Sequence, residues 1–276
     1  MDKRISGIIF AITFMAAVES FSIPAFGQAP AASATPAPAG APGAARPNGG
    51  RGGGGRGGYQ PPTGPAPRMA DGKVDFSGNW APNAIGQNIN LASVGGEPPM
   101  LPWAEKLYNE HKGNISKDDP EARCLPPGVP RMSTTPYPWT MMQNDKQIII
   151  VYEGGAHVWR KIFLDGRPHN PQTVETWLGD STGHWEDNDT LVVETVGQND
   201  ITWLDEDGHP HTNKMVVTER FRRPDLGLLE IEHTIDDPGA YSKPWKFTTH
   251  PTMLNGELIE YICQENNRDI QHLVGK

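Results

Sequence analysis

From residue 140 onward, short segments in which apolar and polar residues alternate are separated by clusters of turn-forming residues. An alternation with a period of two is typical of strands that bury one face, and short turns pair consecutive strands as hairpins. Turn-forming residues lie at 154–155, 187–189, 223–227 and 255–256. The four predicted hairpins pair 148–152 with 158–164, 182–186 with 191–196, 215–221 with 228–235, and 245–249 with 258–263.

This succession of hairpins predicts a mostly β fold, an antiparallel up-and-down meander of about eight to ten strands that closes into a barrel. A barrel of this size has an interior wide enough for one small ligand. One short helix is predicted over residues 101–111, where apolar residues follow helical spacing and Pro102 fits the first turn. Six prolines brace an arm over residues 118–138. The strands do not alternate with helices, which excludes a doubly wound α/β fold.

Residues 1–27 are predicted to be a signal peptide. Two basic residues precede an apolar run over 5–18, and Ala25 and Gly27 supply the small residues that a signal peptidase requires. The run is too short for a membrane span, and the chain after it is polar. We therefore expect a periplasmic or secreted protein without membrane insertion. A retained N-terminal anchor is the alternative.

Residues 28–70 are rich in proline, alanine and glycine, and residues 71–276 form the predicted β-barrel domain. The tract has too few large apolar residues to offset the entropy lost on ordering, so a disordered linker is predicted. It carries four arginines and no acidic residue, whereas the whole chain has a net charge of −9. The folded domain is therefore strongly acidic, which disfavours nucleic-acid partners. The basic linker could make a weak contact with an anionic envelope polymer.

The two cysteines of the chain, Cys124 and Cys263, are predicted to form a disulfide. An even number of cysteines in an exported protein favours pairing, because the compartment is oxidising. The bond would join an early loop to the last predicted strand and close a loop of about 140 residues. A catalytic thiol or a metal ligand is the alternative, but no partner signature surrounds either cysteine.

The third predicted hairpin places one ionisable residue in each of two apolar rows. If the turn is centred on Asp225, Glu219 lies opposite Ile231 and diagonal to His233, about 7–8 Å away at Cα. A glutamate and a histidine that face one interior are candidate catalytic residues for acid–base chemistry. A structural ion pair is the alternative.

The first predicted hairpin contributes two candidate ligand-binding residues, His157 and Arg160, on alternate faces of one strand. An inward guanidinium at Arg160 could meet a carboxylate or enolate of a ligand, or it could pair with a buried acid. Trp177, Trp185 and Trp203 are candidates for stacking on a ring or a sugar, with core packing as the alternative.

His209 and His211 place two imidazoles on one side of an extended segment and are also candidate ligand-binding residues. Their spacing is usable for a divalent metal, although a polar surface turn is the alternative and no metal is assigned. Nothing in the sequence indicates a nucleotide or redox cofactor.

Short strings of residues give the chain two resemblances to known proteins. Gly78-Asn79-Trp80 is similar to the Gly-x-Trp that opens lipocalin-like barrels, which implies that Trp80 closes the barrel floor. Over residues 75–267 the chain also resembles a family of uncharacterised secreted bacterial proteins, which implies no particular activity. That resemblance rests on the strings EARCLPPGVP (121–130), DGRPH (165–169), TWLG (176–179), GHPH (208–211), TERFRRPD (218–225) and DPGAYSKPW (237–245).

Three functions follow from these predictions. The first is the binding of a small molecule inside a lipocalin-like barrel. The second is an exported enzyme of the lyase, isomerase or hydrolase type that uses the glutamate–histidine pair. The third is an interaction module tethered to the envelope by its linker.

Overall fold

The computed structural model describes residues 59–82, 90–114, 116–155, 158–171 and 174–265. The predicted signal peptide and residues 28–58 of the predicted linker lie outside these residues. The strands are β1 (Gly78–Ala81), β2 (Trp139–Gln143), β3 (Gln147–Tyr152), β4 (Trp159–Phe163), β5 (Asp180–Trp185), β6 (Leu191–Val196), β7 (Val216–Asp225), β8 (Leu228–Asp236), β9 (Trp245–Thr249) and β10 (Thr252–Met253). The helices are α1 (Leu91–Gly95) and α2 (Pro102–Gly113), with short 3-10 helices η1 (Pro120–Arg123) and η2 (Arg131–Ser133).

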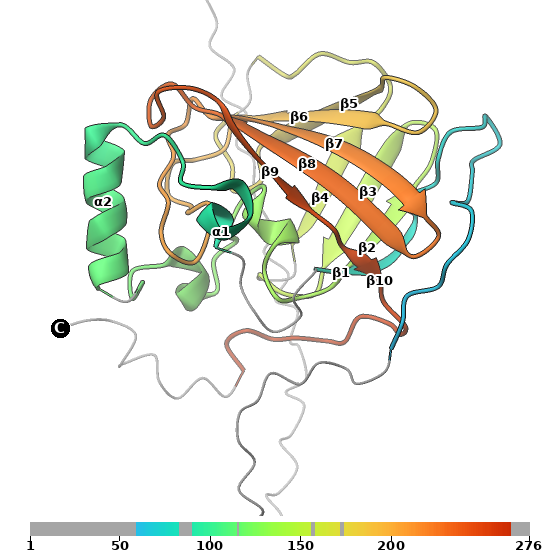
Figure 1. Cartoon of the computed structure of the whole chain (residues 1–276), viewed down its shortest axis with the longest axis horizontal. Helices are drawn as coiled ribbons and strands as arrows, with labels where there is room; N and C mark the ends of the chain where they lie inside the picture. Colours follow the sequence, from blue (N-terminus) through green and yellow to red (C-terminus); the bar gives the residue numbers. More distant parts are fainter. Residues whose placement is uncertain (1–58, 83–89, 115, 156–157, 172–173, 266–276) are drawn as a thin grey trace, which may run out of the picture. The chain divides into compact units, whose positions relative to one another are not determined.

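These strands form one sheet in the order β10-β1-β2-β3-β4-β5-β6-β7-β8-β9, and β10 also pairs with β8. The second pairing of β10 closes a barrel of nine strands, with β9 lying along the free edge of β8 (Figure 1). The predicted mostly β barrel is therefore confirmed. The predicted helix corresponds to α2, whereas α1 was not predicted. Within the described ranges, no helix is long and apolar enough to cross a bilayer.

Neighbouring strands run antiparallel with one exception. The hairpins β3–β4, β5–β6 and β7–β8 form as predicted. Between them, β4 and β5 are parallel and share only the pairs Ile162–Ser181 and Phe163–Thr182. The chain must therefore return along the barrel between these two strands, because parallel neighbours need a long connection. The meander is thus interrupted once, and the barrel is mixed.

The fourth predicted hairpin is wrong. Residues 258–263 form no strand, and β9 pairs with β8 instead. Pro251 separates β9 from β10, since proline has no amide hydrogen to continue the ladder. The side chains of Ile259 and Ile262 are 69% and 47% exposed, so the apolar residues that suggested a strand bury no face.

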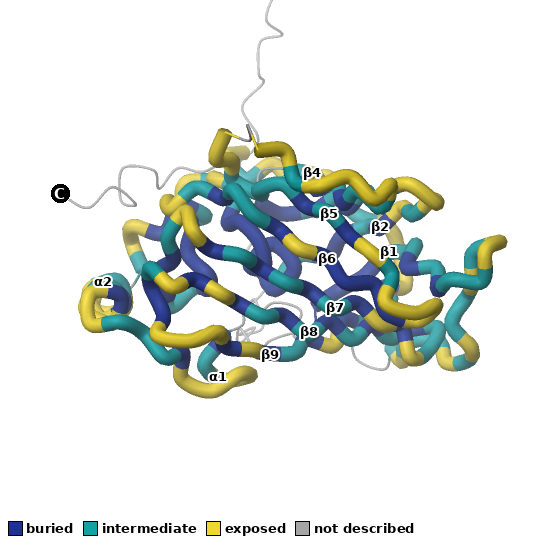
Figure 2. The backbone as a smooth tube through the Cα atoms, turned by 90° about the horizontal axis from the view of Figure 1, so that it is seen from above, coloured by how far each residue is buried: buried dark blue, intermediate teal, exposed yellow. Residues whose placement is uncertain are grey.

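The barrel is filled with side chains in two apolar clusters. Buried and partly exposed residues alternate along β7 and β8, and Figure 2 shows this alternation on neighbouring strands. One cluster surrounds Trp80, which is fully buried and lies under the Arg223 guanidinium at 4.8 Å. The other cluster, around Val217 and Ile235, extends to residues of α1 and α2.

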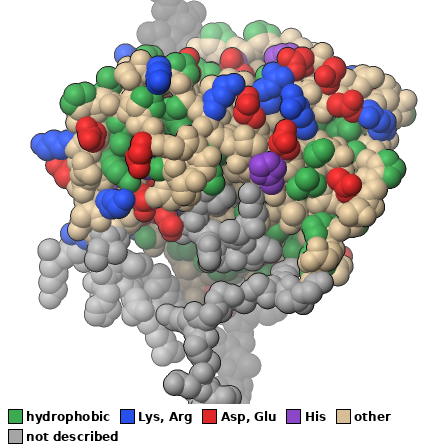
Figure 3. Space-filling view, viewed as in Figure 1, with side chains coloured by type: hydrophobic (Ala, Val, Ile, Leu, Met, Phe, Trp, Pro, Cys, Tyr) green, Lys and Arg blue, Asp and Glu red, His purple; other side chains and the backbone are tan. Residues whose placement is uncertain are grey.

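The outer face of β7, β8 and β9 carries charges of both signs side by side (Figure 3). Arg220 pairs with Glu186, and Lys246 Nζ lies 2.9 Å from Glu232 Oε1. Arg222 extends the same face toward Glu230. These side chains are partly exposed, so this side of the barrel faces water. Solvated pairs of this kind contribute little stability.

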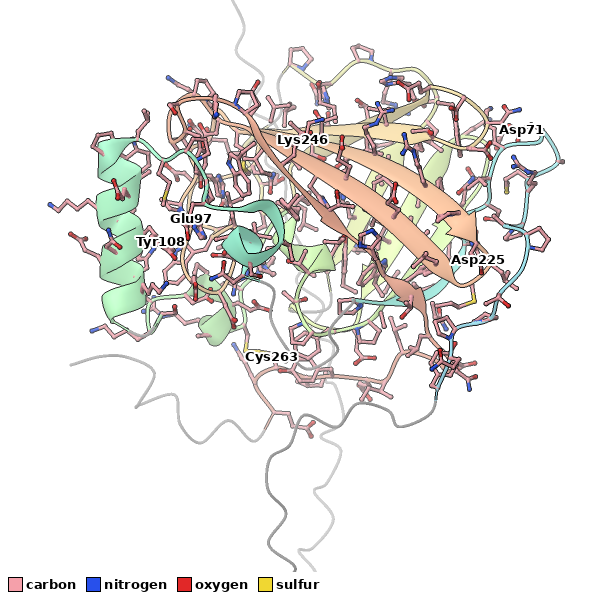
Figure 4. All side chains as sticks on the ribbon, viewed as in Figure 1. Asp71, Glu97, Tyr108, Asp225, Lys246 and Cys263 are labelled. Atoms are coloured by element: carbon pink, nitrogen blue, oxygen red, sulfur yellow. A yellow bond between two sulfur atoms is a disulfide. The ribbon has the colours of Figure 1, made fainter. Side chains whose placement is uncertain are left out.

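Residues 59–70, which the sequence assigned to the linker, contact the barrel. Tyr59 donates a hydrogen bond to the Met253 carbonyl, and the Gly64 amide donates one to Asp225 at the turn between β7 and β8 (Figure 4). Arg68 pairs with Asp189 at 2.6 Å. The part of the predicted linker that the structure describes, from Tyr59 on, therefore lies against the barrel.

The predicted disulfide between Cys124 and Cys263 is confirmed, with Cα atoms 5.8 Å apart. It joins the end of η1 to the segment that follows β10, which Figure 4 shows below the barrel. The same segment is held by a hydrogen bond from Tyr137 to Tyr261 and by one from the Ile259 amide to Glu153. The C-terminal segment is thus attached by the disulfide and by hydrogen bonds, which also include one from Asn79 of β1 to the Gly256 carbonyl.

Candidate functional site

A buried charged cluster lies inside the barrel, formed by Arg160 of β4, Glu219 of β7 and His233 of β8. Arg160 Nη2 donates to Glu219 Oε2 at 2.5 Å, and His233 Nδ1 lies 3.4 Å from Glu219 Oε1. None of the three side chains is more than 1% exposed. The structure therefore brings together three of the residues that the sequence singled out, and it gives Arg160 the buried acid named as its alternative partner.

The pairing of Glu219 differs from the prediction. Glu219 lies directly opposite His233, not opposite Ile231 with His233 on the diagonal. The register shifts between Arg222 and Asp225, so the turn is tighter than the sequence suggested. This shift puts the carboxylate and the imidazole on adjacent strands at the same level, which explains their short separation.

Hydroxyl groups supply part of the hydrogen bonding of the cluster, whereas Arg160 Nη1, Glu219 Oε1 and His233 Nδ1 are buried without a hydrogen-bond partner among the described residues. Arg160 Nε donates to Ser181 Oγ at 3.0 Å, and its Nη2 also donates to Thr195 Oγ1 at 2.7 Å. On the other side, His233 Nε2 lies 3.2 Å from Thr249 Oγ1, and the ring stacks on Phe247 at 4.5 Å. Residues of β4 to β9 therefore share one polar layer between the two apolar clusters.

Burial and charge act in opposite directions on Glu219. Desolvation alone would raise the pKa of this carboxyl, but the charge of Arg160 and the adjacent His233 ring outweigh it and lower the pKa to about 2. Glu219 is therefore ionised at neutral pH, as a buried carboxylate with a permanent cationic partner must be.

This lowered pKa predicts a loss of stability in acid. The native state keeps Glu219 ionised to lower pH than the unfolded chain, in which the ordinary value is 4.5, so the unfolded state binds more protons. The free energy of unfolding should fall by about 3 kcal/mol from this group as the pH drops from about 4.5 to about 2. Urea unfolding across this range measures it, with an Arg160→Met/Glu219→Leu protein as the control. Equal acid sensitivity of both proteins would contradict the prediction.

A pocket of about 560 Å³ lies where β4 and β5 diverge. Trp159, whose side chain points outward and is 61% exposed, stands at its edge. Asp180 and Lys161 supply polar groups to the same pocket. The apolar wall consists of Pro126, Val158, Trp159, Phe163, Trp177 and Leu178.

The inner side of this pocket reaches the charged cluster. Arg160 and Ser181, which hydrogen bond to each other in the polar layer, are also pocket residues. At this point β4 and β5 share only two residue pairs. The pocket and the Arg160–Glu219–His233 cluster thus have Arg160 in common, and together we call them the β4–β5 site.

The remaining predicted residues lie elsewhere or outside the described chain. His157 is outside the described residues. Trp203 is buried and stacks on His111 of α2 at 4.0 Å, so it packs a loop against the helix. Trp185 stacks on Phe76 at 5.8 Å. Of the three candidate stacking tryptophans, only Trp177 lies in the pocket.

His209 and His211 each have their own partners beneath α2. His209 Nδ1 lies 2.7 Å from Asp205 Oδ2, and the ring stacks on Tyr108 at 4.2 Å. His211 Nε2 lies 2.6 Å from Thr202 Oγ1, and burial lowers the pKa of this histidine. Among the residues with a described position, no group of three His, Cys, Asp or Glu side chains is arranged to hold a metal ion.

Sequence reasoning missed most of the outer half of the site. The alternation along β4 places Trp159 and Phe163 on the face opposite Arg160, and of the aromatic residues of the pocket only Trp177 was a candidate. The parallel pairing of β4 with β5, which brings Asp180 and Ser181 to the pocket, could not be recognised from hairpin spacing. Two outward aromatic residues on one strand were the available signal.

A search with models of known protein families found no match to this chain, and a search of curated proteins found none with significant similarity. The resemblance to secreted bacterial proteins therefore stays a prediction.

Proposed function

We propose that the protein binds a small, largely apolar molecule with a planar ring at the β4–β5 site. The observation that carries this proposal is the aromatic wall of the pocket, with Trp159 exposed beside Phe163 and Trp177. A volume of about 560 Å³ is typical of small-molecule sites, which combine apolar walls with a few polar groups. An exposed aromatic side chain at a pocket offers a large apolar area on which the ring of a ligand can stack.

Acid–base catalysis by Glu219 and His233 is the second candidate, supported by their separation of 3.4 Å. Both side chains are fully buried, and Arg160 keeps the carboxylate ionised. A substrate in the pocket would reach them only past Arg160 and Ser181. The positions of Arg160, Glu219 and His233 are equally those of a structural ion pair, so they do not favour catalysis. Ligand binding is therefore the better supported function.

We also infer that the protein works outside the cytoplasm. The disulfide supports this inference, because such bonds persist in oxidising compartments. The apolar N-terminal run supports it independently. In this setting the linker would act as a spacer between the barrel and its surroundings, which keeps an envelope-tethered module as a further alternative.

Fluorescence titration with N-phenyl-1-naphthylamine, a neutral planar probe, tests the binding proposal. We expect saturable binding to the full mature chain, and about tenfold weaker binding by each of Trp159→Ala and Trp177→Ala, because each removes one aromatic wall. Trp103→Ala is the matched control, since Trp103 is also exposed, at 43%, but lies on α2 away from the pocket. No saturable binding, or equal losses in all three proteins, would overturn the proposal.

A further inference from the structure

His169 lies between two carboxylates on the outside of the barrel. Its Nδ1 is 2.9 Å from Asp180 Oδ2 of β5, and its Nε2 is 3.2 Å from Glu194 Oε1 of β6. The Thr182 hydroxyl is also 3.2 Å from Nε2. His169 belongs to the return segment after β4, so this one ring connects that segment to two strands.

The number of protons on the ring decides how many of these contacts are favourable. A neutral imidazole has one N–H, whereas an imidazolium donates from both ring nitrogens. In the neutral form, Nδ1 can donate to Asp180, and Nε2 can accept only from the Thr182 hydroxyl. Only the protonated ring donates to both carboxylates at once, so protonation adds the contact with Glu194.

Two described carboxylates lie against His169. Asp180 and Glu194 face it from β5 and β6, and the Asn170 amide donates to the same Asp180 oxygen at 3.2 Å. On the same segment, Arg167 is paired with Asp165 at 2.5 Å and also feels the charge of Asp180. Asp180 and Glu194 are thus the two carboxylates that lie against the ring nitrogens of His169.

This segment borders the β4–β5 pocket at two points. Asp180 is a pocket residue, and the Arg167 guanidinium lies 3.9 Å from the centre of the Phe163 ring, which forms part of the apolar wall. We propose that His169 is a proton-controlled pin, whose imidazolium fastens residues 165–170 to β5 and β6 and thereby stiffens this edge of the pocket. The consequence for ligand binding rests on the proposed function, whereas the pin itself does not.

Hydrogen exchange of the ligand-free full chain tests the pin. Protection factors, which correct for the intrinsic pH dependence of exchange, are compared at pH 5.5 and pH 8 for peptides covering 164–171. We expect protection to be about threefold to fivefold higher at pH 5.5, the size expected for a partly exposed ion pair. In His169→Gln and in Glu194→Gln this difference should vanish, because each lacks one half of the second contact.

His184→Gln is the matched control, since it removes another histidine of the barrel surface on β5. It should keep the wild-type difference. Wild-type protection that is equal at both pH values, or a difference that survives His169→Gln, would overturn the pin. Titration with N-phenyl-1-naphthylamine at the same two pH values tests the link to ligand binding separately. Absence of probe binding would count against the proposed function. An affinity that does not change with pH, together with hydrogen exchange that does, would count against the link between the pin and the pocket.

Discussion

A Glu219→Leu protein is expected to lose about 3–5 kcal/mol of its free energy of unfolding, because the change leaves the Arg160 guanidinium buried without its counter-ion. Arg160 would keep only hydroxyl partners, at Ser181 and Thr195. Urea unfolding followed by tryptophan fluorescence measures the loss. An effect of this size would be among the largest for a single substitution.

The control replaces both charges. In an Arg160→Met/Glu219→Leu protein no unpaired charge remains, and replacing a buried ion pair by apolar residues of similar size is often neutral. We therefore expect the double variant to recover most of the stability lost by Glu219→Leu. If the single variant is as stable as the native protein, or if the double variant is less stable than the single one, the pair is not the interaction that we describe.

Removing the disulfide is expected to have an effect of similar size. A Cys124→Ser/Cys263→Ser protein should lose about 4–5 kcal/mol, since the bond closes a loop with a sequence separation of 139 residues and restricts the unfolded chain. Guanidinium unfolding measures the loss.

Reduced native protein is the control and should match the double-serine variant. The folded barrel should survive both changes, because its strands pair without the bond. An unchanged midpoint for the double-serine variant would show that the closed loop does not restrict the unfolded state.

The parts of the fold that could be predicted are those with local causes. The alternation along β7 and β8 and the turn between them identify their pairing without any distant information. Helix α2 follows in the same way from its apolar spacing and Pro102. The parallel pairing of β4 with β5 has no local signature, because it depends on where the return segment brings the chain back.

The candidate site shows the same division. Glu219, His233 and Arg160 could be recognised because each interrupts an apolar row, and the structure brings all three together. Their exact register could not be recognised, since a single shifted residue at the turn moves His233 from diagonal to opposite. The exposed aromatic wall and the His169 contacts combine residues of the return segment with β4, β5 or β6, so no spacing within one hairpin reveals them.

The short pairing of β4 with β5 has a consequence for how this barrel holds together. It divides the wall into two leaves, β10-β1-β2-β3-β4 and β5-β6-β7-β8-β9, each antiparallel throughout. The leaves meet at the two pairs of β4 with β5 and at the single pair of Thr252 with Leu228. Arg160 belongs to the first leaf and Glu219 to the second. Their buried ion pair therefore joins the two leaves from inside the barrel, in addition to the few backbone pairs between them.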